Sequence, residues 1–345
     1  MLYTEARLPR WPTLDEIIAY GILEDILKRP LQISFMNKDR VLTNAELQEL
    51  NQQGVLLVGF DKKVGPNEEA ISSTASMVDE LRSVGGLPAE DNVLDELARM
   101  LARDNQDGYL TKSQPFAAGF VAQSAYRHGY DHQEVVYRTA HVGQVLVKVM
   151  TERSNGRPDL ASHEHAKLTP AMALLPEKAP RTHCGPFTVS RYIRDMYTLG
   201  YTDADMVARA SWFIEIHNQA KVQRAAADNA AITQTFEKFR LAGQTKIGLW
   251  VQSDDPYLMA ALATDRYDLV AMRSSKGNVI VMSKSFDLSH VAHDLMTKEP
   301  DRWYYGSGQR NMLANGTERV QRPPTQFSRD EIVQSISLNV VRKSM

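Results

Sequence analysis

Four aspartates lie where predicted helices or strands begin or end: Asp15, Asp61, Asp104 and Asp107. Asp15 opens a helical pattern, Asp61 closes an apolar strand pattern, and the other two close a second helical pattern. Carboxylates gathered at element ends of an α/β domain are typical ligands of Mg²⁺ or Mn²⁺ in phosphoryl chemistry. The order of acids therefore predicts a metal site with Asp15, Asp61, Asp104 and Asp107 as ligands.

Each acid also has an ordinary structural explanation. Asp15 and its neighbour Glu16 complement the positive end of a helix. Asp104 and Asp107 are common in loops beside a glycine such as Gly108. Asp61 differs because it follows an apolar strand, which places it at the carboxyl edge of a sheet, where open α/β folds bind ligands.

A glycine-rich turn near the C-terminus is the second candidate site. Gly306 and Gly308 allow backbone N–H groups to approach a phosphate, and Arg310 is able to chelate one. Neighbouring side chains add cationic and stacking groups: Arg302, Arg319, Arg322, Trp303, Tyr304 and Tyr305. The alternative is a hairpin turn with a partly buried aromatic cluster and solvated arginines.

Two histidine-containing segments fit ordinary roles better than metal sites. Asp131 precedes a helical pattern that begins near Gln133, so it is expected to cap that helix. His163, His165, His183 and Cys184 offer zinc ligands, but their spacing matches no standard zinc motif.

Composition limits the classes of function. The chain has 345 residues, enough for about two domains. Its net charge of −2 provides no global basic field for nucleic acid or an anionic membrane. Its single cysteine suits a reducing compartment. The polar N-terminus lacks a signal-peptide core, and no run approaches the about 18 apolar residues of a membrane span. We expect a cytoplasmic protein without membrane contact.

The elements that must position these residues alternate over the first 150 residues. Apolar periodicity predicts helices over 13–28, 44–50, 72–84, 93–103, 115–127 and 133–150, with strands over 31–35 and 55–60. This alternation predicts a parallel sheet covered by helices.

The rest of the chain changes character twice. Residues 151–186 read as a proline-rich irregular connection, and 188–241 as helix. Strands are predicted over 247–252, 267–273 and 279–283, with a hairpin at Gly277-Asn278. Helices are predicted over 257–263, 290–296 and 329–336. The expected organisation is an α/β domain over 1–150, a helical connector over 151–244 and a smaller α/β domain over 245–345.

The order of these motifs resembles the DHH phosphoesterase superfamily, in particular its melanocyte-proliferating-gene-type branch of metal-dependent nucleases. Thr13-Leu14-Asp15-Glu16 matches the motif that opens the first helix, and Asp61 matches the strand-terminal aspartate. Asp104 to Gly108 matches the later Asp-Asn-Gly-like element. The turn Gly306 to Arg310 and the helix from Ser328 to Ile336 match the second domain.

The chain departs from the family at its histidines, since none precedes His128. Thr13 stands where the family has the opening histidine, and Lys62 to Glu69 replace the Asp-His-His signature. Gln309 replaces the histidine that helps to hold substrate in the glycine turn. These departures indicate a catalytically degenerate site.

The resemblance implies a phosphoesterase or nuclease homologue that acts on, or binds, the phosphate of a nucleotide or short oligonucleotide. If active, it is a Mn²⁺- or Mg²⁺-dependent phosphodiesterase or exonuclease, with Asp15, Asp61 and Asp104 as catalytic residues. Gly306, Gly308, Gln309 and Arg310 are then expected to hold substrate across a cleft between two domains. The alternative is a non-catalytic structural or regulatory protein that forms a homo-oligomer, or binds a protein partner, through the Ala-rich helix 204–231.

Overall fold

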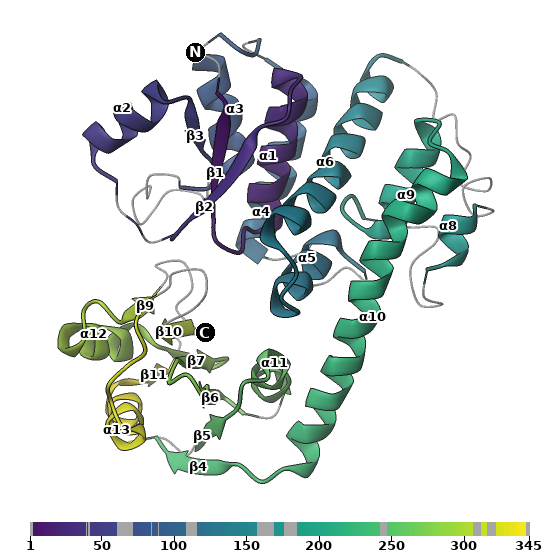
Figure 1. Ribbon diagram of the computed structural model, residues 1–345. Coiled ribbons are helices and arrows are strands. Elements are labelled where there is room, and N and C mark those ends of the chain that lie inside the picture. Colours follow the sequence, from purple (N-terminus) through teal and green to yellow (C-terminus); the bar gives the residue numbers. More distant parts are fainter. Residues whose placement is uncertain are drawn as a thin grey trace. The chain divides into compact units, whose positions relative to one another are not determined.

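The computed structural model (Figure 1) resolves the chain into two compact units, Met1–Ala220 and Lys221–Met345. It describes residues 3–38, 40, 42–60, 72–83, 85–88, 90–107, 116–156, 169–175, 185–241, 247–265, 267–305, 312–315 and 322–342. Side chains are described within these ranges except at 44, 104–107 and 263–265. Both units combine helices and strands, so the predicted α/β class is confirmed.

A parallel sheet lies in the first unit, as predicted. Its strands are β1 (Glu5–Pro9), β2 (Gln32–Met36) and β3 (Val55–Leu57), in the order β2-β1-β3. Ala6 pairs with Ile33 on one side and with Leu56 on the other. The central strand therefore comes first in the chain, and the second and third strands add to opposite sides of it.

β1 was not predicted, although it is the centre of this sheet. Its signal is a short alternation in which Ala6 and Leu8 are fully buried while Glu5 and Arg7 are partly exposed. Glu5 and Arg7 form an ion pair of 2.8 Å on one face of the sheet. Because Glu5 and Arg7 are two of the five residues of β1, the sequence pattern there was interpreted as a polar N-terminus.

The helices of the first unit largely match their predicted ranges. They are α1 (Leu14–Leu27), α2 (Asn44–Gln52), α3 (Ser73–Ser83), α4 (Asn92–Asp107), α5 (Ala118–Arg127), α6 (His132–Ser154), α8 (Pro170–Ala173) and α9 (Val189–Thr198), followed by α10 (Asp203–Thr233). No described helix is long and apolar enough to cross a membrane.

α1 and α6 pack side by side through glycines (Figure 1). A Cβ atom on Gly21 of α1 would lie 2.9 Å from the backbone oxygen of Ala140. A Cβ atom on Gly143 of α6 would lie 2.5 Å from the Cδ1 atom of Ile18. A side chain at Gly21 would meet the backbone of α6 and force the helices to shift, whereas one at Gly143 would require the Ile18 side chain to move.

The segment 151–244, expected to be a connector, contributes directly to the core of the first unit. Met172 of α8, Ile193 of α9 and Phe213 of α10 are at most 1% exposed and belong to the same apolar cluster as β1 and α1. The division between the units at 220 and 221 falls within α10, inside this segment. Its apolar residues were visible in the sequence, but the cluster that they complete was not.

The second unit is built on a six-stranded sheet in the order β4-β5-β6-β7-β10-β9. The strands are β4 (Glu237–Arg240), β5 (Ile247–Gln252), β6 (Leu269–Arg273), β7 (Val279–Ser283), β9 (Trp303–Tyr305) and β10 (Met312–Asn315). β5 and β6 are parallel and the other pairs are antiparallel. The predicted hairpin between β6 and β7 is confirmed, whereas β9 and β10 were not predicted. The prediction of helix over 188–241 is wrong at its end, because α10 stops at Thr233 and β4 follows.

Helices flank this sheet. α11 (Pro256–Asp265) joins β5 to β6, and α12 (Ser289–Lys298) packs beside α13 (Arg329–Asn339) (Figure 1). Val291, Leu295 and Ile336 of the last two helices share a buried cluster with Ala271 and Val281 of the sheet. β8 (Phe286–Asp287) and β11 (Val341–Arg342) form a separate short antiparallel pair.

Candidate functional site

The carboxyl edge of the first sheet brings together residues that follow each of its strands. Glu16 follows β1, Lys38 follows β2, and Gly59 with Phe60 follows β3. Because the order is β2-β1-β3, the chain changes direction across the sheet between β1 and β3. In open parallel sheets, ligands bind outside the carboxyl ends of the strands at such a switch point.

Glu16 and Lys38 form a half-buried ion pair at this edge. The Lys38 Nζ atom lies 3.0 Å from Glu16 Oε1, and the exposed fractions of the two side chains are 28% and 3%. The backbone N–H of Thr13 donates to Glu16 Oε2 over 2.6 Å. Glu16 therefore has a hydrogen-bond donor at each carboxylate oxygen. Lys38 Nζ also lies 5.7 Å from the centroid of the Phe60 ring, a cation–π distance.

Gly59 allows the exit of β3 to approach Glu16. Its φ of 82° lies in the left-handed region that favours glycine. A Cβ atom there would lie 2.5 Å from Glu16 Cγ. Backbone conformation and contact therefore both require glycine here, and the carboxylate of Glu16 is held in place from this side.

Asp15 ties α1 to the beginning of α3. Its Oδ2 atom accepts the backbone N–H of Ser73 over 2.6 Å, and its Oδ1 atom accepts the Thr74 N–H and hydroxyl over 3.1 and 2.8 Å. The side chain is 2% exposed. Asp15 lies in the first turn of α1, as the structural explanation predicted, and it also complements the N-terminus of α3.

The described part of this edge does not fit a divalent metal. The oxygens of Asp15 and Glu16 are engaged by backbone, hydroxyl and ammonium donors that bring no further ligand for a metal ion. Over the described residues, no group of three His, Cys, Asp or Glu side chains is placed to hold a metal ion. Asp15 and Glu16 therefore belong to no such group of three within the described structure.

The other predicted site residues lie partly or wholly outside the described residues. Asp61 is not described, and neither are Gly306, Gly308, Gln309 and Arg310. Asp104 and Asp107 lie within α4, which continues past the predicted end at 103, and their side chains are not described. The convergence of Asp15 with Asp61, Asp104 and Asp107 stays a prediction. The histidine and cysteine segment 163–184 also falls almost entirely outside the described ranges.

An aromatic group that sequence reasoning missed lies at the start of α6. Trp11, which has a φ of 51°, stacks on Tyr126 at 5.9 Å between ring centroids. His132 packs edge-on against Tyr126 and Phe35. Asp131 caps α6 by accepting the N–H of Glu134 over 2.9 Å, as predicted. Single aromatic residues separated by more than a hundred positions gave no local signal for this group.

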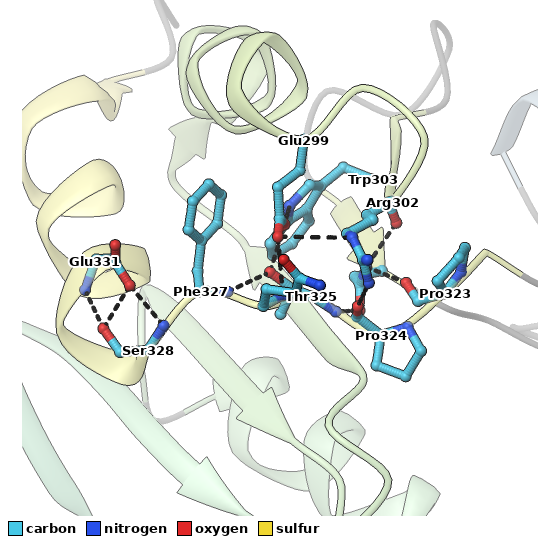
Figure 2. A network of polar contacts seen from close by, with 11 residues as sticks. Glu299, Arg302, Trp303, Pro323, Pro324, Thr325, Phe327, Ser328 and Glu331 are labelled. Atoms are coloured by element: carbon cyan, nitrogen blue, oxygen red, sulfur yellow. Dashed lines mark hydrogen bonds and ion pairs between the residues drawn. The ribbon is translucent and has the colours of Figure 1, made fainter.

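In the second unit, Glu299 organises the polar network shown in Figure 2. Its Oε2 atom accepts the Trp303 Nε1–H over 2.9 Å and the Thr325 hydroxyl over 2.6 Å, and its Oε1 atom accepts the Gln326 N–H over 2.8 Å. Trp303 is completely buried. Of the two alternatives, a side chain that stacks on a base and a member of a buried aromatic cluster, Trp303 is the second. It is not available to stack on a base.

The described arginines of this network bind backbone carbonyls. Arg302 donates to Pro324 O (Figure 2), and Arg322 donates to Trp303 O and, over 3.2 Å, to Pro300 O. The Asn315 amide donates to Arg302 O and Pro323 O over 2.6 and 2.9 Å. These bonds fasten the segment after residue 321 to β9 and β10, so Arg302 and Arg322 serve structure.

A partly buried histidine of α6 joins α9 and the connection between α9 and α10. His141 Nδ1 lies 2.6 Å from the Tyr192 hydroxyl, and Nε2 lies 3.3 Å from the Tyr201 hydroxyl. Burial, and secondarily the charges of Arg209 and Lys148, lower the pKa of His141 to about 4. The imidazole is therefore neutral near pH 7, and both its nitrogens have partners, which is the pattern of a structural histidine.

Comparisons with known proteins give structural matches only. No protein-family model and no curated protein matches the chain. A crystal structure of RecJ from Thermus thermophilus in complex with Mg²⁺ matches 96% of this chain, with 10% identity and a TM-score of 0.40. The same protein in complex with Mn²⁺ matches over 90%, with 11% identity and a TM-score of 0.43. This chain spans 49% of the length of each.

A structure of exonuclease RecJ bound to manganese matches 96% of this chain and 89% of its own, with 11% identity and a TM-score of 0.40. At these identities and TM-scores, the likeness assigns neither a family nor an activity to this chain.

Proposed function

We propose that this chain is a DHH-like protein that binds the phosphate of a nucleotide or short oligonucleotide at the carboxyl edge of β1–β3, without metal-dependent hydrolysis. The motif order supports the DHH-like assignment. The switch point between β1 and β3 supports the location, since open α/β sheets bind ligands there.

The observation that carries the proposal is the ion pair of Glu16 with Lys38. A carboxylate that ligates Mg²⁺ must offer an oxygen to a hard cation whose octahedral geometry is strict. Here the cation beside Glu16 is an ammonium, and the neighbouring Asp15 accepts donors from α3. The acids of α1 therefore serve the fold, while the sheet edge keeps a positive group.

The enzyme hypothesis differs in one specific respect. It requires Asp61 and Asp104 to hold Mn²⁺ or Mg²⁺, which as a Lewis acid would activate water and neutralise phosphate charge. Replacing Asp61 by Asn removes one ligand charge at a residue that our proposal leaves without a catalytic role. The two hypotheses therefore predict different results for Asp61→Asn.

The test measures binding and cleavage with the same oligonucleotides. Fluorescently labelled hexamers of thymidylate and uridylate are titrated with the full chain in excess EDTA, and then incubated with it in Mn²⁺. We expect saturable binding in EDTA and no cleavage in Mn²⁺ above a buffer control. Cleavage that requires Mn²⁺ and disappears in Asp61→Asn would establish the enzyme and overturn the proposal.

One observation favours self-association as a second candidate function. Val222 and Ile232 of α10 are 71% and 62% exposed, whereas Ala227 and Ala231 of the same helix are buried. Exposed apolar side chains mark a protein–protein interaction site where they join into a contiguous patch. A homo-oligomer would dissociate in Val222→Glu, as measured by light scattering. A wild-type chain that is monomeric at all concentrations tested would rule this candidate out.

A further inference from the structure

The described partners of Lys38 engage only part of its ammonium group. An ammonium has three N–H donors. One bonds to Glu16 Oε1 over 3.0 Å, and the face toward Phe60 makes a cation–π contact. No second oxygen acceptor for Lys38 lies among the described residues. With 28% of its side chain exposed, Lys38 is accessible at the edge of the sheet.

The surroundings of Lys38 hold it in one place. Glu16 is 3% exposed and is fixed by the Thr13 N–H and by close contact with Gly59. A lysine held by a helix glutamate is a known way to present an ammonium to phosphates, as in protein kinases.

From this geometry we infer that Lys38 supplies the cation that binds the phosphate at this edge, in place of a divalent metal ion. The inference rests on the proposed function and names the residue that carries it. The ligand class is a phosphate oxyanion of a nucleotide or oligonucleotide. Lys38 contacts it as a point charge, while Glu16 and Phe60 are positioning residues.

Arg40 provides a matched control on the same connection. It lies two residues beyond Lys38 and carries the same charge, but it is 55% exposed and pairs with Glu46 over 3.2 Å. Replacing either residue by Met changes the net charge equally. A difference between the two variants therefore reports position rather than overall charge.

The experiment measures the affinity of labelled thymidylate hexamer in excess EDTA over a series of salt concentrations, for the wild type, Lys38→Met, Lys38→Arg and Arg40→Met. We expect Lys38→Met to raise the Kd about tenfold, the effect of losing one charge-assisted hydrogen bond. It should also lower the slope of log affinity against log salt by about 0.7, one single-strand phosphate contact. Lys38→Arg should recover part of the affinity, and Arg40→Met should leave the Kd within about twofold of the wild type.

The outcomes separate the inference from the function on which it rests. A Lys38→Met protein with the wild-type Kd and salt slope would overturn the role of Lys38 while leaving phosphate binding intact. Equal losses in Lys38→Met and Arg40→Met would also overturn it, because they would report net charge alone. A wild type that binds neither the hexamer nor inorganic phosphate would overturn the proposed function itself. Circular dichroism of each variant verifies the fold, and Lys38→Arg keeps the charge should the Met variant be unstable.

Discussion

The carboxyl edge of the first sheet and the Glu299 network of the second unit contain the same types of residue and use them differently. Both place a buried glutamate beside a cation and an aromatic ring. In the second unit, Arg302 and Arg322 give hydrogen bonds to backbone carbonyls, which fasten one segment to another. At the first edge, the one hydrogen bond of Lys38 among the described residues goes to Glu16, and 28% of its side chain is exposed. The partners of a cation and its exposure, and not its charge alone, decide what it does.

The largest effect that separates the two regions is expected for Trp303→Ala. Removing a fully buried tryptophan leaves a cavity and takes away one of the two donors to Glu299 Oε2, so unfolding of the second unit should become easier by about 3 to 5 kcal/mol. Urea denaturation followed by circular dichroism measures this. The control is Tyr304→Ala, at a partly exposed neighbour, with a smaller expected loss. A folded Trp303→Ala protein that loses only oligonucleotide affinity would show that Trp303 stacks on bases after all.

The two units should also differ in their response to acid through His141. Its pKa is about 4 in the fold, below the ordinary value of 6.5, so the unfolded chain takes up the proton first. The stability that neutral His141 provides is complete above pH 6.5 and is lost as pH falls toward 4, by up to about 3 kcal/mol. The stability difference between wild type and His141→Gln should therefore shrink over that range.

Asp195 and Asp294 also have shifted pKa values, which affect stability over the pH range of the His141 measurement. Burial raises the pKa of Asp195 to about 6, so protonation of this residue favours the fold as pH falls from 6 toward 3.8, opposite to His141. Because Asp195 is present in both proteins, its effect cancels in the difference. In the second unit, hydrogen bonds to Ser335 and Lys298 outweigh burial and lower the pKa of Asp294, whose stabilisation is lost only at more acid pH. A difference between wild type and His141→Gln that does not change with pH would contradict the account of His141.

A smaller loss, about 2 kcal/mol, is expected for Asp15→Asn, because two N–H donors and a hydroxyl at the start of α3 then face an amide. The matched control is Asp131→Asn, since asparagine caps a helix as well as aspartate does. Thermal unfolding of both variants measures the contrast. An Asp15→Asn protein as stable as the wild type, but with weaker Mn²⁺ binding, would restore the metal role of Asp15.

The sequence predicted the elements with strong local patterns. Helices α1, α3 and α6 and the β6–β7 hairpin follow from apolar periodicity and a Gly-Asn turn. β1 was missed because burial of only Ala6 and Leu8 is enough to place it at the centre of a parallel sheet. β9 and β10 were missed because their pairing depends on residues distant in sequence, such as Asn315 and Arg302.

The candidate site was predicted only in outline. The sequence placed Asp15 at the opening of the first helix, but it could not show that Asp15 would bond to Ser73, which lies 58 residues away. The placement of Asp61 at the carboxyl edge of the sheet stays a prediction. Lys38 carried no motif and was not considered. Its role depends on the strand order β2-β1-β3, which brings its segment beside Glu16 and Phe60. Contacts of this kind follow from topology, which local patterns do not contain.

The most direct test of the central claim is the metal dependence of phosphate binding by the wild-type chain. The Kd for labelled thymidylate hexamer is measured in excess EDTA and again with saturating Mn²⁺, at one ionic strength. With Lys38 as the cation, the two values should agree within about twofold, since no bound metal is needed to neutralise the phosphate. Binding that appears only with Mn²⁺ and is abolished by EDTA would contradict the account and return the acids to a metal centre.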